Sequence, residues 1–75
     1  MYRSKKWFAE YYQIGLTTVQ EIIELIRKTN RYPENSIIRT GKILRIRRDA
    51  FEDALRYRDR IECELPVPEF REGIV

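Results

Sequence analysis

Apolar residues recur at helical spacing in two stretches near the start of the chain, with a three-residue break between them. The first stretch, Lys5 to Tyr12, follows Ser4, a residue type that caps helix N-termini. The second stretch runs from Leu16 to about Thr29. Its apolar stripe comprises Val19, Ile22, Ile23 and Ile26. The pattern predicts two short helices joined by a tight turn, which is the arrangement of a helix-turn-helix.

The turn between these two helices lacks glycine at its first position. Gln13 stands where many helix-turn-helix proteins have a glycine that accepts a left-handed backbone. If Gln13 adopts that conformation, it costs about 1 kcal/mol. Gly15 would then cap the second helix, or it would absorb the strain itself. Ala9 is small enough to let the helices approach closely, and Ile14 can fill the corner between them.

A β-hairpin is predicted after a loop at Asn30–Ser36, because residues 37–47 form two β-prone runs about a Thr-Gly-Lys turn. Alternation along the strands is expected to point Ile38, Leu44 and Ile46 toward the helices. The opposite face would then carry Arg39, Ile43, Arg45 and Arg47, with Lys42 at the tip.

A third helix is predicted from Asp49, with Asp49 as its N-cap and Glu52 completing a capping box. Its inward stripe would comprise Phe51, Ala54, Leu55, the stem of Arg58 and Ile61. Its water-facing residues would be Glu52, Asp53, Arg56 and Asp59. We expect residues 1–4 to be a frayed start, apart from the cap at Ser4.

The fold class that follows is mainly α with a β-hairpin wing, in one domain over residues 1–62 and an extended tail over residues 63–75. The tail contains Pro66 and Pro68 and little periodicity. It is expected to dock on a partner, to lie across the domain itself, or to be no more than a frayed terminus.

The composition excludes several classes of protein. No apolar run approaches the roughly 20 residues that a membrane span needs, and no signal peptide is visible. Cys63 is the only cysteine and histidine is absent, so neither an internal disulfide nor a metal site is expected. No serine or cysteine sits in a nucleophile motif. We therefore expect a cytoplasmic protein that is not an enzyme and has no catalytic residues, metal or cofactor.

Basic residues are concentrated in the middle of the chain, although the net charge is only +3. Residues 27–48 hold eight basic groups and one acidic group, whereas residues 49–75 hold four basic and eight acidic groups. Such a block favours binding to a polyanion, because each neutralised phosphate releases condensed counterions. A merely solvated hairpin is the alternative, since charged outer faces also protect edge strands.

The exposed side of the second helix and the hairpin are the candidate DNA-binding surfaces. On the helix the candidates are Leu16, Thr17, Thr18, Gln20, Glu21, Glu24 and Lys28. On the hairpin they are Arg39, Thr40, Lys42, Arg45 and Arg47. Hydroxyls and an amide can hydrogen-bond base edges, while arginines and lysines fix register on phosphates. The aromatic residues of the first helix are expected to pack in the core, with stacking on unpaired bases as the alternative.

Residues 5–58 together resemble the excisionase family of MerR-type winged helix-turn-helix proteins, particularly the small excisionases of conjugative transposons. The resemblance rests on the run Ala9-Glu-Tyr-Tyr-Gln-Ile-Gly15, the basic hairpin about Gly41 and the Asp49-Ala-Phe helix start. It implies binding to double-stranded DNA, with the second helix in the major groove and the wing on backbone or minor groove. It also implies DNA bending and assistance to a tyrosine recombinase (integrase) during excision of a mobile element. Glu21 and Glu24 make the reading helix less positive than is usual in this family.

Other functions fit the same sequence. A small winged-helix transcriptional regulator would use the same residues, and a protein-interaction adaptor would bind a partner through the tail. Because a monomer of this size covers a short site, self-association on DNA is a further expectation.

Overall fold

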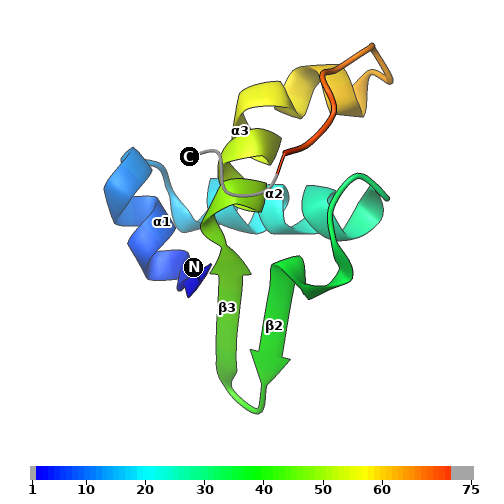
Figure 1. The fold of residues 1–75 in the computed structure, drawn as a ribbon. Coiled ribbons are helices and arrows are strands. Elements are labelled where there is room, and N and C mark those ends of the chain that lie inside the picture. The colour runs from blue at the N-terminus through cyan, green and yellow to red at the C-terminus, as the bar shows by residue number, and fades with distance from the viewer. Residues whose placement is uncertain (1, 72–75) are drawn as a thin grey trace.

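The structure, a computed structural model, describes residues 2–71 and contains three helices and a three-stranded antiparallel sheet (Figure 1). The elements are β1 (Tyr2–Arg3), α1 (Lys5–Tyr12), α2 (Leu16–Lys28), a 3₁₀ turn (Glu34–Ser36), β2 (Ile37–Thr40), β3 (Ile43–Arg47) and α3 (Arg48–Glu62). In the sheet, β3 lies between β1 and β2. The described chain is therefore a mostly helical α+β structure, in agreement with the coarse fold class predicted.

The first two helices begin where they were predicted, and their ends lie within one residue of the prediction. The Ser4 hydroxyl accepts a hydrogen bond from the Trp7 backbone N–H at 3.2 Å, which is the expected N-cap contact. After α1, Gln13 is left-handed, with φ of 55° and ψ of 48°. The Ile14 N–H then donates to the Ala9 carbonyl at 3.0 Å, which closes the helix end. Gly15 has extended backbone and is the N-cap of α2, so it does not relieve the strain at Gln13.

The core lies between the three helices and the inner face of the sheet. Phe8 of α1 stacks on Phe51 of α3, with ring centroids 4.0 Å apart. The other buried apolar residues are Val19, Ile22, Ile23, Leu25, Ile26, Ile46, Ala50 and Ala54. The predicted apolar stripe of α2 is thus confirmed, and so is the inward position of Phe51 and Ala54.

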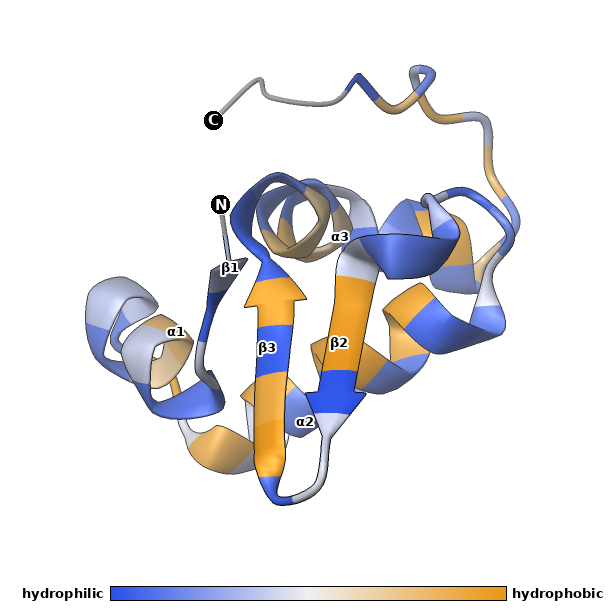
Figure 2. Ribbon diagram, turned by 60° about the horizontal axis from the view of Figure 1, so that its bottom comes forward, coloured by the Kyte–Doolittle hydropathy of each residue, from blue (hydrophilic) through white to orange (hydrophobic). Residues whose placement is uncertain are grey.

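The hairpin turns at Gly41 and Lys42, because Thr40 pairs with Ile43 across a two-residue loop. Gly41 has a φ of 58°, a conformation that side chains resist, and glycine at the first loop position is typical of one tight hairpin turn. The hydropathy colouring of Figure 2 shows β3 as hydrophobic residues interrupted by one hydrophilic position. The hairpin itself was therefore predicted correctly.

The phase of β2 differs from the prediction. Ile37 pairs with Ile46 and Arg39 pairs with Leu44, and residues directly opposite each other share a face of the sheet. Ile37 and Arg39 therefore lie on the helix-facing side with Ile46, while Ile38 points outward and is 40% exposed. The prediction that Ile38 points inward and Arg39 outward was wrong. The inward positions of Leu44 and Ile46 were correct.

Tyr2 and Arg3 are paired rather than frayed, so the prediction of a frayed start was wrong for them, while Met1 lies outside the described residues. Tyr2 pairs with Arg47 and Arg3 pairs with Ile46, so β1 adds an edge strand to the hairpin. The Tyr2 hydroxyl donates a hydrogen bond to the Asn35 carbonyl at 2.7 Å. A strand of two residues is too short to show periodicity, so the hydrophobic pattern did not predict it.

α3 starts immediately after β3, without the predicted capping box. Its N-cap is Arg47, which makes no side-chain capping bond. Asp49 instead lies in the first turn and is buried; its carboxylate accepts hydrogen bonds from the Ala50 backbone N–H and from Arg47, both at 2.7 Å. The predicted capping role of Asp49 with Glu52 was therefore wrong, because the helix begins before Asp49.

The tail folds back along α3 toward the body of the molecule (Figure 1). It leaves the helix through Glu64, whose φ is 56°. Phe70 packs against the core cluster, and its ring centroid lies 5.0 Å from that of Tyr32. Of the possibilities considered for the tail, its described part shows docking on the domain itself. Residues 72–75 of the predicted tail lie outside the described residues.

Candidate functional site

A groove of about 620 Å³ separates the C-terminal half of α2 from β2. Its lining comprises Ile26, Arg27, Thr29, Asn30, Tyr32, Pro33, Glu34, Ser36, Ile37 and Arg39. Arg27 enters the groove from α2, and Arg39 enters it from β2 because the register of the hairpin turns Arg39 toward the helices. Two arginines thus border one concave surface from different elements.

The groove carries a net positive charge, because no carboxylate among the described residues forms an ion pair with its cations. Neither Arg27 nor Arg39 forms an ion pair with any residue between 2 and 71, and Glu34 is the only carboxylate among the lining residues. Both arginines are exposed. Like charges on facing walls repel, so an anion between them would lower the energy of the free surface.

The candidate DNA-binding residues of the hairpin lie in two different environments. Lys42 at the tip and Arg45 on β3 are exposed, and Thr40 is exposed beside them. Arg47 is different: its guanidinium donates to Asp49 at 2.7 Å and its side chain is only 15% exposed. Arg47 therefore forms an ion pair at the start of α3 and is not presented to solvent on the hairpin.

The outer face of the hairpin is more apolar than predicted. Arg45 shares this face with Ile38 and Ile43, which are 40% and 55% exposed. The prediction of three arginines on one outer face was wrong, because Arg39 lies on the inner face and Arg47 is paired. Arg39 therefore faces α2, whereas Arg45 remains on the outer face of the hairpin.

The outward face of α2 is shared between α3 and the hairpin. Glu21 accepts a hydrogen bond from Arg58 of α3 at 2.8 Å, and Lys28 lines a hollow with Glu62 of α3. Glu24 lines the same hollow, so these three predicted reading residues border α3.

Four other candidates lie in the N-terminal half of α2. Leu16 and Thr17 are exposed, while Thr18 and Gln20 are half-buried. Arg27, which the candidate set omitted, lies seven residues after Gln20 and hence on the same side of the helix. That spacing is the signal in the sequence that would have found it.

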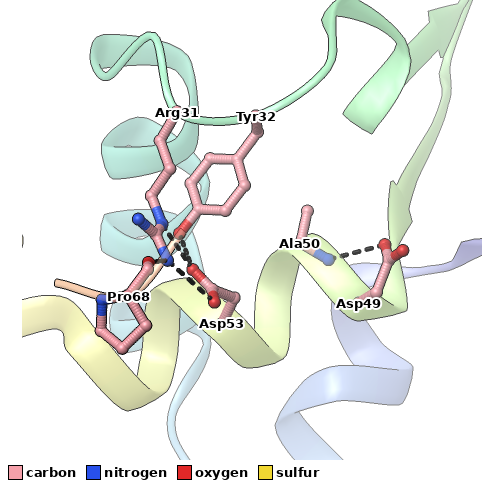
Figure 3. Close-up of polar contacts among 6 residues, drawn as sticks. All are labelled: Arg31, Tyr32, Asp49, Ala50, Asp53 and Pro68. Atoms are coloured by element: carbon pink, nitrogen blue, oxygen red, sulfur yellow. Dashed lines mark hydrogen bonds and ion pairs between the residues drawn. The ribbon is translucent and has the colours of Figure 1, made fainter. Parts of the chain in front are cut away.

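A polar junction holds the loop after α2 against α3 and the tail (Figure 3). The Arg31 guanidinium donates two hydrogen bonds to the Asp53 carboxylate, at 2.8 and 3.2 Å, and a third to the Pro68 carbonyl. The Tyr32 hydroxyl donates to the same carboxylate at 2.7 Å. Asp53 was predicted to face water, but its side chain is only 16% exposed. Residues separated by more than 20 positions meet here, so no local pattern announces the contact.

The ionisation of this junction follows from its burial. Burial raises the pKa of the Tyr32 phenol well above 10.0, and its hydrogen bond to Asp53 adds to the effect. The hydrogen bond to Asp53 is also the main cause of a raised pKa at Arg31. Near neutral pH, Tyr32 is therefore a neutral donor and Arg31 a cation, which suits the carboxylate that both of them contact.

The aromatic residues of α1 are divided between core and surface. Phe8 is buried, whereas Tyr11 is 54% exposed and stacks on Trp7 with centroids 4.7 Å apart. Arg48 covers the pair, 5.0 Å from the Tyr11 centroid and 5.4 Å from that of Trp7. The expectation of core packing is fully confirmed for Phe8. The Trp7–Tyr11 pair is instead covered on its outer side by the Arg48 guanidinium.

Comparison with protein-family models, with curated proteins and with solved structures found no match. Within residues 2–71, no helix is long and apolar enough to cross a membrane, and no cluster of three potential metal-ligating side chains occurs. Any function therefore has to be inferred from the side chains and their arrangement.

Proposed function

We propose that this protein binds double-stranded DNA through the groove between α2 and the hairpin. The observation that carries the proposal is the convergence of Arg27 and Arg39, both without a carboxylate partner among the described residues, on one concave surface. Arginines that remain unneutralised in this way fit a row of phosphates, since counterion release favours their binding. Lys42 at the exposed tip extends the positive charge along the hairpin.

Base reading would fall to the N-terminal half of α2. Thr17 is exposed there, and Gln20 lies on the side of the helix that also carries Arg27. A glutamine amide can donate to and accept from adenine, and a threonine hydroxyl can bond several base edges. Phosphate contacts by the arginines would set the register in which these side chains meet the bases.

The order of elements supports a finer proposal, a winged helix-turn-helix in which the hairpin is the wing. Two helices about a tight turn, followed by a basic hairpin and a third helix, match the arrangement implied by the excisionase resemblance. An excisionase-like factor that bends DNA and assists a tyrosine recombinase is therefore our specific proposal, with self-association on DNA as part of it. A small transcriptional regulator would use the same surface.

The adaptor alternative receives less support from the tail. Its most apolar described residue near the end, Phe70, already packs against the core, and the Pro68 carbonyl already accepts a hydrogen bond from Arg31. A partner would have to displace these contacts before it could bind the same side chains.

Titration of a duplex at two salt concentrations tests the proposal. We expect parental binding to weaken steeply as salt rises, and the Arg27→Ala/Arg39→Ala double variant to bind about tenfold more weakly at low salt. The slope of log affinity against log salt should flatten by about 1.8, because two phosphate contacts are lost.

Arg60→Ala is the matched control, because Arg60 is also an exposed cation but lies on α3 and does not line the groove. It should leave both affinity and slope close to the parental values. Absence of salt-dependent duplex binding by the parent protein would refute the proposed function. An equal effect of Arg60→Ala would show that net charge, rather than the groove, accounts for binding.

A further inference from the structure

The loop over residues 30–36 has the candidate groove on one side and the tail on the other. Tyr32 belongs to both: it lines the groove, and its ring meets Phe70 of the tail edge-on at 5.0 Å with an interplanar angle of 76°. Its neighbour Arg31 donates to the Pro68 carbonyl and to Asp53 (Figure 3). The tail therefore contacts the same loop, residues 30–36, that forms one wall of the groove.

Apart from the packing of Tyr32 against the core cluster and of the Arg31 guanidinium over the Tyr57 ring, the first half of this loop is held by polar contacts to Asp53 and the tail. The backbone hydrogen bond of Ser36 to the Pro33 carbonyl, 3.1 Å, lies within the loop itself. The bond from Tyr2 to the Asn35 carbonyl holds its far end. Among the described residues, the polar anchors of Arg31 and Tyr32 are thus Asp53 and the tail. A backbone held mainly by side chains is ordered only as long as those side chains are held.

We propose that Pro68 and Phe70 of the tail are positioning residues for the groove that binds DNA. The inference rests on the proposed function. Phe70 packs on the Tyr32 ring and the Pro68 carbonyl holds Arg31, so that the loop stays in place beside Arg27 and Arg39. The tail need not contact DNA in this arrangement, because Pro68 and Phe70 contact Arg31 and Tyr32 but are not among the residues that line the groove. It acts by ordering the groove wall before DNA arrives.

Phe70→Ala separates positioning from direct contact. We expect duplex affinity to fall by about 3- to 10-fold. The loop would then become ordered only when DNA binds, and the conformational entropy lost in that step reduces the free energy of binding. The salt slope should stay at the parental value, because no cation has been removed. A residue that contacted phosphate would change both quantities. A shortened chain lacking residues 68–75 should show a comparable loss of affinity; its salt slope is no test, because it also lacks Arg71.

Leu65→Ala is the matched control, since Leu65 belongs to the same tail but is 54% exposed and, unlike Phe70, is not among the residues packed against the core. It should bind duplex as the parent does. Phe70→Tyr keeps the ring and should restore parental affinity. Circular dichroism at the titration temperature confirms that each variant is folded. Parental affinity of folded Phe70→Ala would overturn the inference.

Amide hydrogen exchange in the free protein tests, without DNA, whether the tail orders the loop. Phe70→Ala should speed exchange of the loop amides between residues 31 and 36 and leave that of the buried α2 segment unchanged. If the parent binds no duplex, the proposed function fails, and this measurement still tests whether the tail orders the loop. Unchanged loop exchange would overturn the positioning role, and faster exchange throughout α2 would show general destabilisation instead.

Discussion

At the scale of single residues, Gln13 has a backbone conformation that glycine normally supplies at a helix end. Its φ of 55° brings its Cβ close to the following carbonyl oxygen, which is unfavourable for any residue with a side chain. The helix end nevertheless closes normally, since Ile14 donates to the Ala9 carbonyl. The strain is therefore local, and a substitution at this position should relieve it without changing the fold.

Gln13→Gly should stabilise the protein by a few tenths to about 1 kcal/mol. Glycine removes the left-handed penalty, although it also makes the unfolded chain more flexible and so gives back part of the gain. For a chain of this size, 1 kcal/mol corresponds to a rise in Tm of about 4–8 °C. Thermal melts followed by circular dichroism measure the difference. Gln13→Ala keeps a Cβ and should give no such gain; equal melting of both variants would mean that the turn carries no strain.

At the scale of elements, periodicity predicted the helices better than the faces of the strands. The stripe of α2 is long enough to define its buried side, and its bounds were found within one residue. In β2, Ile37 and Ile38 are adjacent and equally β-prone, so alternation alone does not choose which one is buried. Pairing with Ile46 of β3 makes the choice, and that is a contact between strands.

The same distinction applies to the candidate site. Arg39 lines the groove only because β2 turns it toward the helices, whereas alternation along the sequence predicted that it faces outward. The junction of Arg31 with Asp53 joins residues 22 positions apart and has no local pattern at all. Charge counting located the cationic segment correctly, but tertiary pairing decided which of its cations stay available. Arg47, for example, forms an ion pair with Asp49.

Two matched substitutions on β3 test which face of that strand is buried against the helices. Ile46 is fully buried and Ile43 is 55% exposed, although both are isoleucines of one strand. Ile46→Val should lower the free energy of unfolding by about 0.5–1.5 kcal/mol, because it deletes a buried methyl group. Ile43→Val should change it by less than about 0.5 kcal/mol. Urea denaturation measures both, and an equal cost at the two positions would contradict the register.

At the scale of the whole molecule, charge is separated between two ends. Around the hairpin the exposed cations Arg39, Lys42 and Arg45 have no ion pair with residues 2–71. Near α3, by contrast, carboxylates are matched by arginines, as Arg58 is with Glu21 at 2.8 Å and with Glu62 at 2.9 Å. A surface that keeps its positive charge at one end can be attracted to DNA in one orientation. The neutralised end is where the tail and α3 meet.

Asp53 ties this second end together, so its removal should affect the whole domain. Its carboxylate accepts hydrogen bonds from Arg31 and Tyr32, and Arg31 in turn holds the Pro68 carbonyl of the tail. We expect Asp53→Asn to cost about 1.5–3 kcal/mol, the usual range for a hydrogen bond to a charged group, because Arg31 is only 12% exposed and loses its counter-charge. For a chain of this length that is a large share of a stability of roughly 3–5 kcal/mol.

Urea denaturation of Asp53→Asn, Arg31→Met and the double variant gives the coupling directly. If the junction acts as one unit, the double variant should lose less than the sum of the two single losses. Strict additivity would mean that Asp53 supports the helix alone and that the loop and the tail are held independently of it.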